Sequence, residues 1–520
     1  MADEADSQAQ KFHGTIPRGL DYVSRSTSTG GRFGRLFRHL SPFLPDDALL
    51  VDLAKTMIEH GVEVDENDAR SNNATIPAGF TYFGQFVDHD LTFDPTSKLE
   101  RENDPDSLED FRTLRFDLDS LYGRGPDDSP FMYRDQAHFA IGTDSQGKED
   151  LPRNSEDPAR ALIGDPRNDE NLIVSQLHLA FLKFHNRVVD DLKGPNERFE
   201  RAREIVRRHY QWIVLHDFLP RIGGQPIVDN ILRPDGYEII GVRGAMRWKA
   251  DLKFFRWKVR PFMPVELSVA AYRFGHSMVR YNYALNQETD GQKELLIFDP
   301  NDAHNSNAND LRGFRARPKD RVIEWFRFFE FPGHEQDLQV SRGIDTQISF
   351  GLGGLPDIVV GSPPNSLAER NLKRGKALEL PSGQDVARAM GIPEEAIISS
   401  DNKQYPFKVG TSFKLPDGKD DPSVPPNLPP ERVKQLEAAF GHQTPLWYYI
   451  LKEAELICDG KCLGPVGGRI VAEVFIGLLL GDKTSFLNME PNWRPRKPLF
   501  GCRIDGKYAM PDLLTYALKP

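Results

Sequence analysis

The segment Gly84-Gln85-Phe86-Val87-Asp88-His89-Asp90-Leu91 combines closely spaced polar side chains with an aromatic setting. On a helix, Gln85 and His89 are four residues apart and share one face. An apolar cavity that holds a few placed polar groups has this composition. A single histidine is more often a half-buried structural residue, so a functional interpretation of this segment requires further clusters of the same kind. The aromatic residues around the segment are Phe80, Tyr82, Phe83, Phe86 and Phe93.

Two more polar clusters stand out along the chain. The first, Gly164-Asp165-Pro166-Arg167-Asn168-Asp169-Glu170-Asn171, precedes a long stretch with helical spacing of apolar residues. Glu170 suits the first turn of that helix, where a carboxylate interacts favourably with the helix dipole, so a simple capping role is open. The second is Tyr272-Arg273-Phe274-Gly275-His276. Gly275 is unusual because glycine costs about 1 kcal/mol in a helix interior; it permits the close approach of something flat and bulky.

Helical spacing recurs along the chain, whereas strand-like alternation is sparse and short. Without an internal repeat or a rhythm of alternating strands and helices, a mainly α architecture is favoured. We expect a polar arm at 1–25 and a single domain at 26–520, because no convincing linker divides the remainder. Loops are expected at 143–160, 335–363 and 415–430. The expected helices are 46–61, 171–192, 200–218, 264–281, 320–329, 430–440, 444–457 and 465–480.

Composition excludes several classes of protein. The chain has 520 residues, of which 39% are hydrophobic and 28% charged, so it can bury a sizeable core. A net charge of −11 argues against a nucleic-acid partner, which would need a dense basic face. No run of about 18 apolar residues predicts a membrane span, and no Sec-type signal peptide is visible. A cytoplasmic location is the default expectation, with export by another route left open.

The three cysteines, Cys458, Cys462 and Cys502, are too few for a disulfide framework. Cys458 and Cys462 form a C-x3-C pair without a second pair or a close histidine. We interpret them as ordinary thiols rather than as zinc ligands. A monomer or a weak homo-oligomer is expected.

Taken together, the clusters resemble the animal-type haem peroxidases, the peroxidase–cyclooxygenase superfamily, and a bacterial-like member of it. The motifs occur in the order G-Q-F-x-D-H-D, G-D-x-R-x-x-E, H-x-x-F-x-x-x-H-N-R and Y-R-F-G-H. The resemblance runs from about residue 70 to residue 480. It implies the mainly α haem peroxidase fold of this family, with haem b held between the segment near His89 and the segment that bears His276.

On the proximal side, the resemblance implies that His276 is the ligand of the haem iron, a common role for a neutral imidazole. Asn371 matches the asparagine that hydrogen-bonds this histidine and makes it more imidazolate-like. Arg374 matches a residue that pairs with a haem propionate, and Arg273 matches another arginine on the haem. A surface helix end is the alternative for Asn371 and Arg374.

On the distal side, the resemblance implies that His89 takes a proton from peroxide and returns it to the leaving oxygen. Arg167 would stabilise the negative charge that develops on that oxygen, and Gln85 would order the cavity water or halide. Asp88 and Glu170 match the two carboxylates that form ester bonds with haem methyl groups, so covalently attached haem is expected.

The stretch 111–123 resembles the calcium loop of the same family. By this resemblance Thr113, Asp117 and Asp119 supply oxygen ligands together with the backbone carbonyl of Arg115, and Asp90 completes the set. Hard oxygen donors of this kind suit Ca²⁺. An ordinary acidic turn is the alternative.

The resemblance implies a haem peroxidase that uses hydrogen peroxide, through an oxoferryl state, to oxidise halide, thiocyanate or small aromatic donors in a setting of oxidative stress. A fatty-acid dioxygenase of the same superfamily is the closest alternative. Those enzymes carry a tyrosine three residues before the proximal histidine, where this chain has Arg273; Tyr272 lies one position off. A catalytically inactive binding module with this fold is the other alternative.

Overall fold

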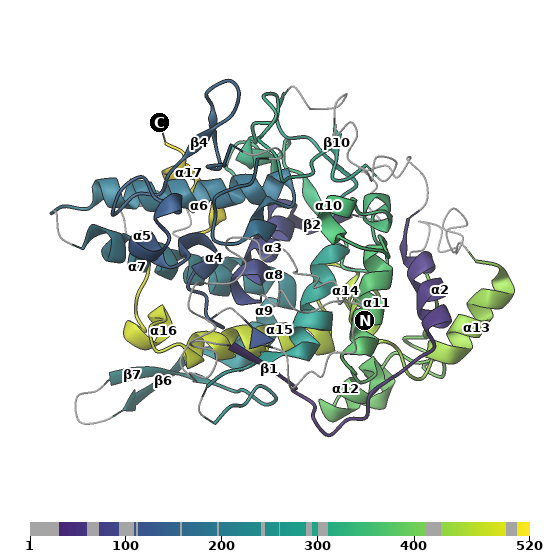
Figure 1. The fold of residues 1–520 in the computed structure, drawn as a ribbon. Helices are drawn as coiled ribbons and strands as arrows, with labels where there is room; N and C mark the ends of the chain where they lie inside the picture. Colours follow the sequence, from purple (N-terminus) through teal and green to yellow (C-terminus); the bar gives the residue numbers. More distant parts are fainter. Residues whose placement is uncertain are drawn as a thin grey trace, which may run out of the picture.

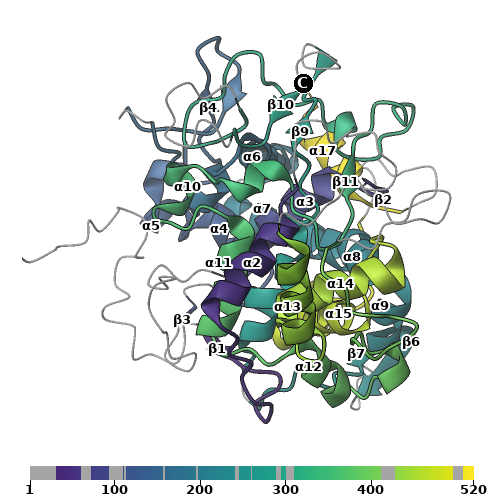
Figure 2. The same cartoon turned by 90° about the vertical axis from the view of Figure 1, so that its right-hand side faces the viewer.

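Helix α3 (Gly79–Leu91) lies near the centre of the molecule, and helices from distant parts of the chain surround it (Figures 1 and 2). The structure is a computed structural model. It describes residues 31–59, 72–92, 109–110, 113–155, 159–194, 197–240, 245–258, 260–287, 294–299, 310–410, 428–495 and 507–519. The predicted polar arm at 1–25 and most of the predicted loop at 415–430 lie outside the described residues.

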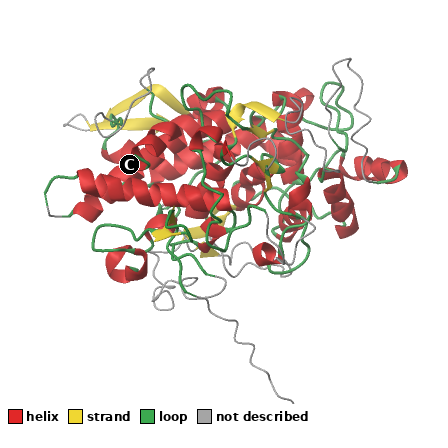
Figure 3. Ribbon diagram, turned by 90° about the horizontal axis from the view of Figure 1, so that it is seen from above, coloured by secondary structure: helices red, strands yellow, loops and turns green. Residues whose placement is uncertain are grey.

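Helices dominate the described part of the chain, which confirms the predicted mainly α fold (Figure 3). Among these helices, none combines the length and apolar character needed to cross a membrane. Besides α3, the α-helices are α2 (Asp47–Met57), α4 (Asp119–Tyr122), α5 (Gly125–Asp128), α6 (Leu172–Asp191), α7 (Arg198–Ile213), α8 (Leu219–Gly223), α9 (Gln225–Ile231), α10 (Asp357–Val360), α11 (Leu367–Ala377), α12 (Gly383–Ala389), α13 (Pro430–Phe440), α14 (Leu446–Cys458), α15 (Pro465–Gly481), α16 (Phe486–Met489) and α17 (Met510–Ala517).

The strands are short and form peripheral ribbons instead of a central sheet. Within the described residues, one sheet has the order β3-β1-β8, and the remaining pairs are β10-β9, β11-β2, β4-β5 and β6-β7. Their bounds are β1 (Gly31–Gly34), β2 (Asn72–Pro77), β3 (Glu109–Asp110), β4 (Gly142–Thr143), β5 (Glu149–Asp150), β6 (Leu232–Ile240), β7 (Ala245–Ala250), β8 (Met263–Pro264), β9 (Asn282–Tyr283), β10 (Leu295–Leu296) and β11 (Val340–Arg342).

Helix α3 starts at a position set by backbone contacts from distant segments. Strand β2 pairs with β11 and leads directly into the helix. The N–H of Gly79, at the first position of α3, donates to the carbonyl of Phe328 at 2.8 Å. A Cβ atom at this position would lie 2.4 Å from Cζ of Phe329 and 2.5 Å from the Phe328 oxygen. Only glycine permits this close approach.

Aromatic packing anchors α3 against its neighbours. The ring of Phe86 stacks on Phe181 of α6 with centroids 4.8 Å apart, and Tyr210 of α7 meets both rings edge-on. All three side chains are buried. Helix α6 confirms the helix predicted at 171–192, and the Asn171 side chain caps it by accepting from the Val174 N–H at 2.9 Å.

The segment 264–281 differs from the continuous helix that we predict. A π-helical turn, Glu266–Ala270, is followed by a 3-10 helix, Ala271–His276. The break falls at Ala270, whose φ of −127° and ψ of −70° are not helical. Helical irregularities of this kind often mark functional segments, and this one ends on His276.

Other local predictions need correction because tertiary contacts compete for the backbone. The helix predicted at 320–329 is wrong: the segment forms only a 3-10 turn, Trp325–Arg327. Within this segment the Phe328 carbonyl accepts from the Gly79 N–H of α3, and the Glu324 N–H donates to the Leu285 carbonyl at 2.8 Å. The loop predicted at 143–160 contains part of the β4-β5 hairpin, and the loop predicted at 335–363 contains β11 and α10.

We predict that Gly79→Ala lowers the free energy of unfolding by about 1–3 kcal/mol, the usual cost of overpacking, because the new methyl group would collide with Phe329. Gly275→Ala is the matched control, since no heavy atom of the part of the chain that the structure describes lies within 4 Å of a Cβ placed there. It should change the stability of the haem-free protein by less than about 0.5 kcal/mol. Chemical denaturation of both variants measures the difference, and equal losses would contradict the packing argument.

Candidate active site

His89 lies buried near the end of α3, and its ring is held by a side-chain relay. Nδ1 of His89 is 2.8 Å from Oδ1 of Asn168, and Nδ2 of Asn168 is 3.0 Å from Nδ1 of His178. An amide oxygen only accepts, so Nδ1 of His89 carries the proton and Nε2 of the neutral ring is the basic nitrogen. Burial lowers the pKa of His178 to about 3, which keeps that ring neutral.

Arg167 holds the C-terminal end of α3. Its Nη2 donates to the backbone carbonyls of His89, at 3.2 Å, and of Thr92. The same group pairs with Asp165 at 2.8 Å. The guanidinium therefore stabilises the helix carbonyls and a fully buried carboxylate in this conformation. Its predicted action on peroxide stays a prediction.

Gln85 joins two of the sequence clusters directly. Its Nε2 donates to Oε2 of Glu170 at 3.0 Å, and its Oε1 accepts from Nδ2 of Asn171 at 2.9 Å. Both ends of the amide are thereby fixed. Burial raises the pKa of Glu170 to about 7, against the opposing attraction of Arg167. Glu170 therefore titrates near neutral pH.

The carboxyl group of Asp88, on α3, interacts with arginines from two other segments of the site. Burial raises the pKa of its carboxyl group, while the positive charges of Arg167 and Arg273 oppose that rise. The hydroxyl of Thr92 donates to Asp88 Oδ1 at 3.3 Å. Since Arg273 belongs to the segment that bears His276, the α3 side and the His276 side share one electrostatic environment.

On the other side, His276 lies between Asn371 of α11 and Trp447 of α14. Nδ2 of Asn371 is 2.7 Å from Nδ1 of His276, and the ring centroids of His276 and Trp447 are 6.5 Å apart. Burial, reinforced by Arg273, lowers the pKa of His276 to about 3. The imidazole is therefore neutral, the state that binds metals.

The amide of Asn371 is oriented differently from what the resemblance implies. Its Oδ1 accepts from Nη1 of Arg273 at 3.0 Å, so its Nδ2 faces His276. An imidazole that binds iron through Nε2 has to donate from Nδ1, which requires the amide oxygen at that position. Rotation about the last side-chain bond of Asn371 would supply it, but the amide nitrogen would then face the Nη1 donor of Arg273, so the Arg273 side chain would have to move as well.

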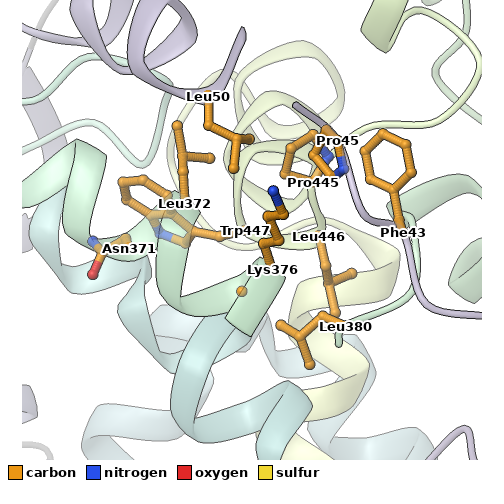
Figure 4. A pocket seen from close by; sticks show the side chains of 11 residues that line it. Phe43, Pro45, Leu50, Asn371, Leu372, Lys376, Leu380, Pro445, Leu446 and Trp447 are labelled. Atoms are coloured by element: carbon orange, nitrogen blue, oxygen red, sulfur yellow. The ribbon is translucent and has the colours of Figure 1, made fainter. Parts of the chain in front are cut away.

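Arg374 follows Asn371 by one helical turn on α11 and shares its face. Between α2, α11 and α14 a small pocket reaches Asn371 and Trp447 (Figure 4). Its volume of about 10 Å³ holds at most about one water molecule. Apolar side chains dominate its lining, so this pocket is a packing gap beside the site and not a substrate cavity.

Several of the site residues line an internal space. Gln85, Asp88, Glu170, Arg273 and His276 retain partly accessible surface, although burial is the largest influence on the pKa of all those that titrate. Because these groups are deep in the protein and yet partly accessible, we infer that they face an internal space. Among the described residues, no heavy atom lies within 4 Å of a Cβ placed on Gly275, the residue before His276. A flat group that binds a neutral imidazole, such as haem, fits this set of residues.

A second constellation gathers three carboxylates. Oxygen atoms of Asp90, Asp117 and Asp119 all lie within 4.8 Å of one another and could hold a metal ion. Thr113 Oγ1 donates to Asp117 Oδ2 at 2.9 Å, whereas Asp117 Oδ1 has no hydrogen-bond partner among the described residues. Burial raises the pKa of Asp117. The side chain of Arg115 points to Asp482, with Nε 3.8 Å from Oδ1. The predicted ligand role belongs to the backbone carbonyl of Arg115, because a guanidinium has no acceptor atom.

The backbone of this acidic loop is strained at two positions. Leu114 and Leu118 have φ values of 55° and 59°, in the left-handed region that branched residues seldom occupy. The Leu118 N–H donates to Oδ2 of the fully buried Asp90 at 3.2 Å. Strain of this kind persists where the surroundings impose it, as in ligand clamps.

The fold resembles that of known proteins. Residues 110–326 match the family model described as "Animal haem peroxidase". Peroxidase A from Dictyostelium discoideum superposes with a TM-score of 0.59 at 16% identity, covering 89% of this chain and 91% of that chain. A fatty acid alpha-dioxygenase from Oryza sativa gives 0.53 at 16% identity, covering 86% and 75%. The chain therefore has the animal-type haem peroxidase fold.

Curated relatives point to the same family. Thyroid peroxidase of Homo sapiens is 29% identical over 45% of this chain, but over only 23% of its own length. Heme peroxidase 2 of Caenorhabditis elegans is 25% identical over 71% of this chain and 47% of its own length. The chain thus spans less than half of these relatives. Each of these relatives carries a peroxidase name and is similar to the chain over part of its length.

Sequence reasoning missed several residues that position the site. Asn168 lies inside a quoted motif, yet only the fold reveals that it links His89 with His178. Tyr272 donates its hydroxyl to the Gly84 carbonyl of α3 at 3.1 Å. Trp447 donates Nε1–H to the Arg273 carbonyl at 3.1 Å. None of these pairings leaves a periodic signal, because each joins residues far apart in the chain.

We predict a pH-dependent effect of Glu170→Gln on the haem-free protein. Glu170 holds its proton more tightly when the protein is folded, with a pKa of about 7 against an ordinary value of 4.5. Its stabilising effect is therefore complete at acidic pH and is lost as the pH rises through 7. Relative to the unmodified chain, the variant should gain up to about 3 kcal/mol between about pH 5 and pH 8. Glu431→Gln, at an exposed carboxylate, is the control. A difference that does not vary with pH would contradict this assignment.

Proposed function

We propose that this chain is a haem peroxidase that uses hydrogen peroxide to oxidise halide, thiocyanate or small aromatic donors. The main support is the orientation of two histidines, each by a hydrogen-bond contact of its Nδ1. His89 presents Nε2 as its basic nitrogen, because Nδ1 donates to Asn168. Burial keeps His276 neutral, as an iron ligand must be. The family to which the comparisons point is consistent with this arrangement.

The haem would be held by residues from both sides of the cavity. His276 would bind the iron, and Arg273 and Arg374 would pair with the propionates. Asp88 and Glu170 would form ester bonds to the porphyrin, because both carboxyl groups border the cavity and burial raises the pKa of each. Bound haem would supply the iron centre at which peroxide is reduced.

The remaining steps belong to the side chains of this chain. Nε2 of His89 would accept a proton from the near oxygen of peroxide and deliver it to the leaving oxygen. The Asn168 relay would keep that nitrogen unprotonated between turnovers. Arg167 would place a positive charge near the leaving oxygen, and Gln85, fixed at both ends of its amide, would orient water or the donor.

A fatty-acid dioxygenase is less well supported than a peroxidase. The position three residues before His276 is Arg273, whose guanidinium contacts Asn371. Tyr272 is buried and its hydroxyl is bonded to Gly84 of α3. Of the solved structures described above, the peroxidase also superposes better than the dioxygenase. An inactive binding module would have no evident use for the His89–Asn168–His178 relay.

We further propose that the acidic loop binds calcium. Asp90, Asp117 and Asp119 supply carboxylate oxygens, with Thr113 and the carbonyl of Arg115 completing the set. Three carboxylates so close together repel one another unless a cation neutralises them. Since Asp90 directly follows His89, calcium there would also fix the end of α3.

We predict that His89→Ala retains haem but slows the reaction with peroxide by about 10²- to 10⁴-fold, the usual contribution of a general acid–base group. Stopped-flow recording of the Soret band after mixing with peroxide measures this rate. His442→Ala, at an exposed histidine, is the matched control and should react normally. A variant that reacts at the unmodified rate would remove His89 from the mechanism.

The unmodified protein with bound haem also tests the class of enzyme. Turnover of bromide, iodide, thiocyanate and a phenol with peroxide would identify the donor. Oxygen uptake with linoleate in the absence of peroxide would instead support the dioxygenase. A protein that binds no haem, with no Soret band, would overturn the proposed function.

We predict that calcium stabilises the chelator-treated protein. At a concentration 100-fold above the dissociation constant, binding contributes about 2.7 kcal/mol to the free energy of unfolding. Asp117→Asn should weaken this stabilisation, because it removes one ligand charge. Asp401→Asn, at an exposed carboxylate, should leave it intact. Thermal unfolding with and without calcium decides the matter; equal melting temperatures would exclude a calcium site.

A further inference from the structure

The turn between α14 and α15 carries two thiols that the active site does not use. Cys458 is the last residue of α14, and Cys462 follows three residues before the start of α15 at Pro465. Both cysteines are free and half-buried, so small oxidants can reach them. The third cysteine of the chain, Cys502, lies outside the described residues.

The backbone of the turn brings the two thiols together. Asp459 and Gly460 adopt left-handed φ values of 52° and 67°, which reverse the chain at the end of α14. The Lys461 N–H then donates back to the Cys458 carbonyl at 2.9 Å. Sγ of Cys458 donates to the carbonyl of Leu463, the residue after Cys462, at 3.6 Å. The Cys458 thiol is thereby held against the segment that carries Cys462, and each thiol shifts the pKa of the other.

Contacts with other segments hold the turn in this conformation. Nδ2 of Asn73, in β2, donates to the carbonyls of Gly460 at 3.0 Å and Lys461 at 3.1 Å. The Leu463 N–H donates to the Ile222 carbonyl at 2.8 Å. The two thiols therefore stay adjacent, and a bond between them would need no refolding of the chain.

The two sulfur atoms are chemically unequal. The neighbouring Cys458 thiol lowers the pKa of the Cys462 thiol to about 7. The same interaction raises the pKa of Cys458. Near neutral pH, Cys462 is then the nucleophile that reacts first, and Cys458 is the thiol that attacks the oxidised Cys462.

We propose that Cys458 and Cys462 form a peroxide-sensitive dithiol that converts reversibly into an intramolecular disulfide. The Cys462 thiolate attacks one oxygen of hydrogen peroxide, the O–O bond breaks, and the leaving hydroxide takes up a proton as water. Cys458 then attacks the resulting sulfenic acid at Sγ, the S–O bond breaks and a second water leaves. Two electrons pass from the thiols to one peroxide. This oxidation needs no haem, so it stands independently of the proposed function.

Lys461 makes the test direct, because trypsin cleaves between the two cysteines. The reduced full-length protein is treated with hydrogen peroxide, blocked with N-ethylmaleimide and digested without reductant. We expect the peptides 453–461 and 462–469 to appear joined by a disulfide, and dithiothreitol to restore two free thiols. Recovery of both peptides as separate maleimide adducts would overturn the proposal.

Three variants distinguish this pair from other routes of oxidation. Cys502→Ser should preserve the joined peptides, since the third cysteine takes no part. In Cys458→Ser, Cys462 should persist as a sulfenic acid that dimedone captures, whereas Cys462→Ser should show far less capture at Cys458. Equal capture at both positions, or a cross-link that includes residue 502, would contradict the assigned roles.

Discussion

The hydrogen bond from Nδ1 of His89 to Oδ1 of Asn168 is the interaction on which the site depends. Asn168 lies between Arg167 and Glu170, so this bond joins the turn before α6 to the end of α3. The amide nitrogen of Asn168 in turn contacts Nδ1 of His178, which lies on α6. Because all three polar groups are buried, each contact replaces a lost hydrogen bond to water. The same contacts that stabilise the fold also decide which nitrogen of His89 is basic.

Charge balance in the interior follows from this arrangement. Burial raises the pKa of the carboxyl groups of Asp88 and Glu170, and the charge of Arg167 opposes that rise at both. Buried charges are costly unless they are paired. Such groups are suited to a cofactor that pairs with them, and the neutral imidazole of His276 is a group that could bind its metal.

The irregular backbone before His276 decides where the neighbouring side chains lie. A regular helix would change the angular position of every side chain between 266 and 276. The π turn and the 3-10 helix instead direct Tyr272 to the Gly84 carbonyl and Arg273 to Asn371. Peroxidases and dioxygenases share the fold, so the choice between these reactions depends on such local placements and not on the architecture.

The sequence by itself determined the long helices and the identity of the clusters. The spacing of apolar residues predicted α6, α14 and α15, because burial of one helix face imposes a period of about 3.6 residues. The motifs also located His89, His276 and the acidic residues that gather near Asp90. These features are local, so a single stretch of sequence contains their whole signal.

Only the tertiary structure decided how distant residues pair. It placed Asn168 against His89 and the amide oxygen of Asn371 against Arg273. It also showed a 3-10 turn within 320–329, where a helix is predicted, and the carbonyl of Phe328 after that turn accepts from α3. It also brought the thiols of Cys458 and Cys462 together, through two residues in left-handed conformations. The physical reason is common to all of them: buried polar groups bond to whichever partner the packed chain brings near, and that partner leaves no periodic trace in the sequence.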